Sequence, residues 1–196
     1  MSEKYFPFDS INKDRVYSST DWVAYLGQFL SDGLVHDNGI PGLDIVSTLN
    51  FGITFSPGGA FIKGRQYILE EEYQLILPAA EANSYRIDYI VLRLDNRITE
   101  RNIKLAIKKG IPCDTREEAV PQELERNDSI WELGLYQITS SPQQKEINPS
   151  DIKDVRGNLD CCTLSNIRAF GDSTIYKGSE TPSEKYTKKY DLWIDI

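Results

Sequence analysis

The chain of 196 residues is poor in the side chains that most often bind metals or act as nucleophiles. It has one histidine, His36, and three cysteines, Cys113, Cys161 and Cys162. Three cysteines form no even set for a disulfide framework, and two adjacent cysteines do not bridge to each other easily. We therefore expect reduced thiols in a protein made in the cytoplasm. An adjacent cysteine pair with one distant histidine is a weak zinc signal, so we predict no metal and no cofactor.

The sequence also lacks long apolar runs and an excess of positive charge. No segment approaches the roughly 18–20 apolar residues that a membrane-spanning helix needs. The first ten residues, MSEKYFPFDS, lack the basic region followed by an apolar region that marks a secretory signal. Asp and Glu outnumber Lys and Arg by 30 to 22, which gives a net charge of −8. Because phosphate-binding proteins usually carry the opposite sign, we expect neither a membrane nor a nucleic acid as a partner.

A helix is predicted near the N-terminus, over about residues 19–32. Ser18 or Ser19 can cap its start, and Asp21 falls in the first turn, where a carboxylate complements the helix dipole. Gly33 is the predicted stop. A single apolar stripe runs along this segment, and such a stripe usually packs on the core, with a partner-binding face as the alternative. The stripe consists of Trp22, Val23, Leu26, Phe29 and Leu30.

After residue 34 the apolar pattern changes to strict alternation, which indicates strands. The most regular stretch is RIDYIVLRLDNRITERNIKLAIKKG, residues 86–110, which predicts a hairpin with its connection at residues 95–101. Alternation puts Ile90, Leu92 and Leu94 on one face of the first strand and the neighbouring residues on the other. We therefore predict a mainly β protein, an antiparallel β-sandwich over residues 1–170 with the N-terminal helix and long loops. Residues 171–196 are predicted to form a linker-like segment and a C-terminal strand.

Charged side chains are frequent in the hairpin. The acidic and basic residues of its first strand, Arg86, Asp88, Arg93 and Asp95, lie toward the strand ends, and basic residues fall on both faces and in the loop. We interpret these charges as ion pairs on the solvent-exposed face of a sheet and not as a basic binding surface. The basic residues are Arg86, Arg93, Arg97, Arg101, Lys104, Lys108 and Lys109.

No catalytic motif is present in the sequence. Asp88 with Asp95, or the acidic run at residues 70–72, would be a glycosidase pair only if two carboxylates converged. A Ser-His-Asp or Cys-His site would depend on His36, which lies in a turn-like HDNG segment, and there is no G-x-S-x-G motif. The glycine-rich SPGGAF at residues 56–61 leads into a strand without a following GK[ST], so it predicts a hairpin turn. We expect no enzymatic activity.

Aromatic side chains near the C-terminus are the candidate binding residues. Tyr186, Tyr190 and Trp193 offer flat apolar faces with a polar tip, which suit contact with sugars or with a partner protein. The alternative is that Trp193 anchors a terminal strand to the body of the protein.

Five segments within about residues 10–160 follow one another in an order typical of a group of phage proteins. They are DRVYSSTDWVAYLGQFLSDGL (14–34), GGAFIKGRQY (58–67), the hairpin sequence (86–110), WELGLYQI (131–138) and INPSDIKDVRG (147–157). The series resembles baseplate and tail-tip proteins of siphophages that infect Gram-positive hosts of the Bacillus type. It is similar to the shoulder domain of lactococcal phage receptor-binding proteins. The ending TPSEKYTKKYDLWIDI resembles a short Gly-Asp-Leu-Trp module of phage tail and fibre proteins, with Tyr190 in place of the glycine.

The resemblance implies a non-enzymatic structural role in the host-adsorption apparatus of a virion. Its expected partners are other tail or baseplate proteins, and the symmetry of a tail tip implies a homo-oligomer. The chain stops without the neck and head of a full receptor-binding protein, so scaffolding is favoured over direct recognition of a receptor. Two alternatives stay open: a carbohydrate-binding protein that contacts host cell-wall glycan, and, less favoured, a cell-wall hydrolase.

Overall fold

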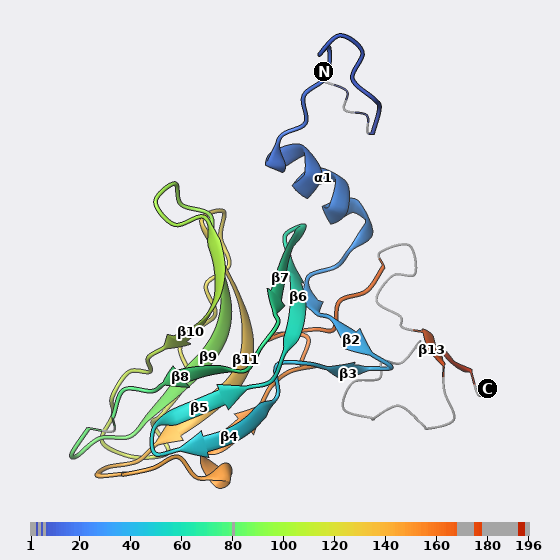
Figure 1. The fold of residues 1–196 in the computed structure, drawn as a ribbon. Coiled ribbons are helices and arrows are strands. Elements are labelled where there is room, and N and C mark those ends of the chain that lie inside the picture. Colours follow the sequence, from blue (N-terminus) through green and yellow to red (C-terminus); the bar gives the residue numbers. More distant parts are fainter. Residues whose placement is uncertain are drawn as a thin grey trace.

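The structure is a computed structural model that describes residues 3, 5, 7–79, 81–167, 175–177 and 192–194. It is mainly β, with a short α-helix near the N-terminus and several antiparallel sheets, as predicted (Figure 1). At 11 residues that helix is too short to cross a membrane, and the described residues include no longer helix that would do so. The N-terminal elements are α1 (Ser19–Phe29), β1 (Gly33–Leu34), β2 (His36–Asp37) and β3 (Ile40–Pro41).

One layer of the fold is a four-stranded antiparallel sheet with the order β10-β9-β11-β12. Its two longest strands, β9 and β11, lie side by side at the centre, which is why both are buried over most of their length. A 3₁₀ turn, η1 (Pro149–Asp151), leads into the edge strand β12. The strands are β9 (Arg86–Asp95), β10 (Asn102–Lys108), β11 (Ile130–Ser140) and β12 (Ile152–Asp154).

The opposing layer consists of two three-stranded sheets, ordered β1-β6-β7 and β4-β5-β8. Buried residues from these sheets and from the four-stranded sheet form one apolar cluster, the arrangement of a β-sandwich. Phe55 of β5 packs against Tyr136 of β11 with ring centroids 6.1 Å apart, and the Tyr136 hydroxyl donates to the Leu43 carbonyl at 3.1 Å. The strands are β4 (Ile45–Leu49), β5 (Gly52–Phe55), β6 (Gly58–Ile62), β7 (Arg65–Leu69) and β8 (Tyr73–Ile76).

The predicted hairpin is formed by β9 and β10 in antiparallel register, with Leu92 opposite Leu105 and Ile90 opposite Ile107. Residues 96–101 connect the strands, in agreement with the expected loop. The predicted division of faces is confirmed, because Ile90, Leu92 and Leu94 belong to the main core whereas Tyr89 and Val91 belong to a small cluster on the other side.

The C-terminal strand pair lies beyond the residues that build the sandwich. β13 (Ile175–Lys177) and β14 (Leu192–Ile194) pair in parallel, with Tyr176 opposite Trp193. The rest of the predicted C-terminal segment, residues 171–174, 178–191 and 195–196, lies outside the described residues.

The start of α1 agrees with the sequence prediction, but its end does not. Ser18 and Asp21 form a reciprocal capping box, in which the Ser18 backbone N–H donates to Asp21 Oδ2 at 2.9 Å. The helix ends at Phe29 and not at residue 32, because Leu30 already has extended dihedral angles. Gly33 is not the stop: it lies in β1, where residues 163–165 pass so close that a side chain would not fit.

The prediction that the apolar stripe of α1 packs on the core is wrong, because the helix has no buried residue. The helix instead rests on the turn between β6 and β7 through two glycines. A Cβ at Gly64, which has φ +71°, would clash with the Val23 carbonyl, while a Cβ at Gly27 would make ordinary contact with the Gly64 Cα at 4.0 Å. Asp32 Oδ1 accepts from the Lys63 backbone N–H at 2.7 Å and completes the attachment.

The two glycines at this contact predict opposite mutational effects. Gly64→Ala should lower the free energy of unfolding by about 2–4 kcal/mol, because alanine is strained at a positive φ and its Cβ meets the helix backbone. Gly27→Ala adds the same methyl group on the other side of the contact, where the space allows it, and should raise helix stability by up to about 1 kcal/mol. Chemical denaturation of both variants measures this. Equal destabilisation by the two substitutions would contradict the described contact.

Candidate interaction surface

Of the three aromatic residues predicted to bind a partner or glycan, the structure describes Trp193 alone. Tyr186 and Tyr190 lie outside the described residues. Trp193 lies in β14, opposite Tyr176 of β13. A binding role for these three residues therefore stays a prediction.

Two charges of the hairpin are buried on its core face and not on the solvent-exposed face where they were predicted. The side chains of Arg86 and Asp88 are 1% and 0% exposed, and Arg86 Nε donates to Asp88 Oδ1 at 3.0 Å. Arg86 Nη2 also donates to the Pro78 carbonyl at 2.6 Å, and Asp88 Oδ1 accepts from the Gly110 backbone N–H at 2.8 Å. The ions are tolerated in the interior because each is paired and hydrogen-bonded.

A second buried charge, Glu132 of β11, is a residue that the sequence analysis did not single out. Its side chain is 0% exposed and accepts hydrogen bonds from Arg93 of β9 and from Lys108 Nζ of β10, the latter at 2.8 Å. The Glu125 backbone N–H donates to its Oε2 at 2.8 Å, which ties the loop before β11 to the sheet. Alternation alone places a glutamate at this position on the outer face, and only the loop that covers that face makes it buried.

Basic side chains hold these carboxylates in ion pairs and hydrogen bonds that lower the pKa of Glu132 and Asp95. Burial by itself raises the pKa of Glu132, but the bonds from Lys108, the Glu125 N–H and Arg93 outweigh it and hold the pKa below its usual value. A side-chain hydrogen bond from Arg97 likewise lowers the pKa of Asp95. A catalytic acid needs the opposite shift. Asp88 and Asp95 also lie on opposite faces of β9, so this pair does not converge as a glycosidase would require.

The single histidine lies in a turn, and two of the three cysteines have thiols with raised pKa values. His36 Nδ1 accepts from the Gly39 N–H at 3.1 Å within the turn between β2 and β3. All three cysteines are free thiols, and burial raises the pKa of Cys162 to about 12 and also raises the pKa of Cys113. Thiols with raised pKa values stay protonated and are poor nucleophiles. Among the described residues, no three His, Cys, Asp or Glu side chains come together as metal ligands.

Exposed aromatic rings cover α1 and the segment that precedes it, which extend away from the sandwich (Figure 1). On the helix, Trp22 contacts Tyr25 edge to face at 6.1 Å between centroids, and Tyr25 contacts Phe29 at 5.1 Å. Trp22 and Phe29 are each 49% exposed. We call this set of rings the aromatic surface; its members are Tyr5, Phe8, Tyr17, Trp22, Tyr25 and Phe29.

The segment before the helix adds a cation and aliphatic side chains to this surface. The Arg15 guanidinium lies 5.2 Å from the ring centroids of both Tyr5 and Phe8, within cation–π distance. Val16 is 87% exposed. Aromatic side chains with a nearby arginine are enriched at protein–protein interfaces, and contiguous exposed apolar groups mark such sites.

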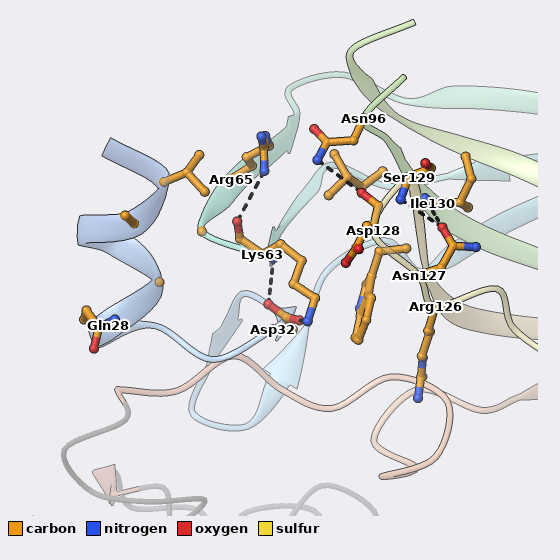
Figure 2. Close-up of a pocket in the computed structure, with 16 residues that line it drawn as sticks. Gln28, Asp32, Lys63, Arg65, Asn96, Arg126, Asn127, Asp128, Ser129 and Ile130 are labelled. Atoms are coloured by element: carbon orange, nitrogen blue, oxygen red, sulfur yellow. Dashed lines mark hydrogen bonds and ion pairs between the residues drawn. The ribbon is translucent and has the colours of Figure 1, made fainter. Parts of the chain in front are cut away.

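A polar hollow of about 510 Å³ separates the opposite face of α1 from the sandwich (Figure 2). Lys63 Nζ lies 3.3 Å above the centroid of the Trp131 ring and 3.9 Å from Asp32 Oδ2. The Arg126 guanidinium lies 5.9 Å from the same ring and donates to the backbone carbonyls of Asp160 and Cys161. Figure 2 shows Lys63, Arg65 and Asn96 beside the gap between the helix and residues 126–130.

The buried position of Glu132 predicts a pH-dependent contribution to stability. Glu132→Gln should lower the free energy of unfolding by about 3–5 kcal/mol at pH 7, because it leaves Arg93 and Lys108 without their anion. The folded-state pKa of Glu132 lies below the ordinary value of 4.5, so its contribution is present above that value and is lost as the pH falls through the folded-state pKa. Denaturation at a series of pH values should therefore show the difference between wild type and variant narrowing below about pH 4.5.

The matched control for this prediction is Glu123→Gln, which removes the same charge from an exposed position of the same loop. Its effect should stay within about 0.5 kcal/mol at every pH. A difference for Glu132→Gln that does not change with pH would contradict the ion-pair account.

In a comparison with known proteins, no protein-family model and no curated protein matches the chain.

Proposed function

We propose that the chain is a non-enzymatic structural component of a phage tail tip or baseplate, which scaffolds or anchors the receptor-binding machinery of the virion. The resemblance of residues 10–160 to such proteins is the origin of this proposal. The observation in the structure that carries it is the aromatic surface on α1 and the preceding segment. A protein that works by contact with neighbouring chains needs such a surface, and an isolated monomer has no use for it.

The geometry of the aromatic surface suits a protein partner. Its rings hold one another edge to face, so they are ordered before any partner binds and lose little conformational freedom on binding. The base of the helix is held by the Gly27–Gly64 contact, which presents the rings on a fixed support. The expected partner is therefore another tail or baseplate protein with an apolar groove, including a further copy of this chain.

The non-enzymatic part of the proposal is supported by the state of the ionisable groups. The buried carboxylates Asp88, Asp95 and Glu132 are each held by a basic side chain. The thiols of Cys113 and Cys162 have raised pKa values. These are the groups from which a hydrolase site would otherwise be built.

Labelling of intact particles tests the location. Antibodies against the chain, applied to virions purified from the bacterial strain that encodes it, should place gold particles at the tail end. The proposal would be overturned if virions that contain all their other tail proteins carried no gold label. Labelling confined to the capsid would do the same.

Substitutions on the aromatic surface test the role of the helix. Trp22→Ser combined with Phe29→Ser should reduce incorporation into particles, or binding to the tail protein captured with the wild-type chain, by at least about tenfold. The reason is that two half-exposed rings at the centre of a contact are typical hot spots. The thermal unfolding curve should change little, since neither ring belongs to the core. Incorporation is measured by quantitative immunoblotting of purified virions.

Leu49→Ser with Ile98→Ser is the matched control. These residues are exposed on β4 and on the β9–β10 loop and neither belongs to the aromatic surface, so the pair removes apolar area without changing that surface. Loss of incorporation with this pair to the same extent would show that general surface hydrophobicity, and not the helix, is responsible.

A further inference from the structure

The polar hollow beside α1 adjoins a second hollow of about 760 Å³, and the two share Arg65, Leu94 and Asn96 in their walls. We call the combined feature the groove. Ser19 and Thr20 line one end and Gln28 lines the other, so the groove follows the helix over about 13 Å at a rise of 1.5 Å per residue. An open groove of this length suits a segment of a linear polymer better than a compact cofactor.

The groove is basic although the chain as a whole is acidic. Its two parts are lined by four basic and two acidic side chains, in a protein with a net charge of −8. Asp32 pairs with Lys63, which leaves Asp128 as the remaining acidic group. The basic residues are Lys63, Arg65, Arg101 and Arg126.

Three of these cations have no carboxylate partner within salt-bridge distance among the described residues: Arg65, Arg101 and Arg126. Among the described residues, the hydrogen bonds of the Arg126 guanidinium go to backbone carbonyls, at 2.8 and 2.9 Å for its Nη2, and these position the guanidinium without neutralising it. Elsewhere in the protein the buried charges are closely matched, as for Glu132 with Arg93 and Lys108. Unmatched positive charge gathered in a concave site attracts an anion.

The other side chains of the groove indicate a hydroxyl-rich ligand. Asn96 and Ser129 line it with an amide and a hydroxyl group, which can both donate and accept hydrogen bonds, whereas the Asn127 amide is already bonded to Glu125 and to the Ser129 and Ile130 N–H groups. Trp131 supplies an apolar wall, but its ring is already covered by the Lys63 ammonium at 3.3 Å. The ring is therefore not free to stack on a base, as the aromatic platforms of single-strand binders do.

From this combination we infer that the groove binds an anionic carbohydrate polymer, a chain of sugar or polyol units that carry phosphate or carboxylate groups. Arg65, Arg101 and Arg126 face the acidic groups, and the Asn96 amide, the Ser129 hydroxyl and Asp128 hydrogen-bond to the hydroxyls. Nucleic acid shares the anionic backbone, but the covered Trp131 ring and the overall negative charge of the protein disfavour it.

Isothermal titration with defined polymers tests the inference. Poly(glycerol phosphate) and polygalacturonate represent the phosphate and carboxylate sources, and neutral dextran and oligo-dT are the comparison ligands. At 50 mM salt the protein should bind at least one of the two anionic polymers saturably, with weaker binding at 200 mM because charge contacts are screened. Dextran should not bind, and oligo-dT should bind more weakly than the anionic polymer. No saturable binding of either anionic polymer, or tighter binding of oligo-dT, would overturn the inference.

Charge reversal locates the site. Arg65→Glu with Arg101→Glu should weaken binding of the anionic polymer by at least about tenfold, since both side chains line the groove. The matched control is Lys145→Glu with Lys153→Glu, which changes the net charge equally at exposed positions near and on β12. The control should bind within about twofold of the wild type. An equal loss of polymer binding in both double variants would show that only the overall charge matters, and the inference would be wrong.

Light scattering of the same variants separates a ligand groove from a contact between copies of the chain. The groove pair should have the same mass in solution as the wild type. A change in mass would assign the groove to a protein interface and overturn the inference. This experiment stands apart from the proposed place in a phage tail, because the groove charges and the aromatic surface lie on different faces of α1 and either proposal can fail alone.

Discussion

The ion network around Glu132 is the interaction on which the rest of the structure depends. One carboxylate on β11 joins Arg93 of β9, Lys108 of β10 and the backbone of Glu125 in the covering loop. A buried charge without these partners would cost several kcal/mol, so the network favours a single register of the three central strands. It also holds the end of the loop, residues 126–130, where that segment forms one wall of the groove. The groove thus depends on a charge that never faces it.

The local part of this arrangement was predictable from the sequence. Alternation is a property of neighbouring residues, so it assigned the faces of β9 and β10 and the position of their connecting loop. The partners of the charges were not predictable, because Arg93 and Glu132 are 39 residues apart. Without that pairing, a charged residue at an alternating position indicates a solvent-exposed face. The actual burial follows from the loop and from backbone groups such as the Gly110 N–H.

The helix shows the same limit. Its cap involves Ser18 and Asp21, three residues apart, and was predicted, whereas the lack of core packing for its apolar stripe was not. Amphipathic spacing indicates that a helix has an apolar face, but it does not indicate which part of the protein covers that face. The groove could not be predicted for a related reason: Lys63 is far in the sequence from Arg126 and Trp131, and only the fold brings its ammonium to the indole ring. The composition is acidic overall, so it does not indicate the positive charge of the groove.

Helical periodicity explains how one short helix serves two surfaces. Trp22, Tyr25 and Phe29 recur on the outward side, while Thr20, Val23 and Ala24, Gly27 and Gln28 recur on the side that lines the groove. Both sides share the backbone contact between α1 and the turn at Gly64, where no side chain intervenes. A displacement of the helix therefore changes both surfaces together. A change of charge at Arg65 or Arg101 alters the groove alone, because neither residue belongs to the helix. The two surfaces are independent in chemistry but share one mechanical support, so a partner bound to the aromatic rings affects a ligand in the groove only to the extent that it moves α1.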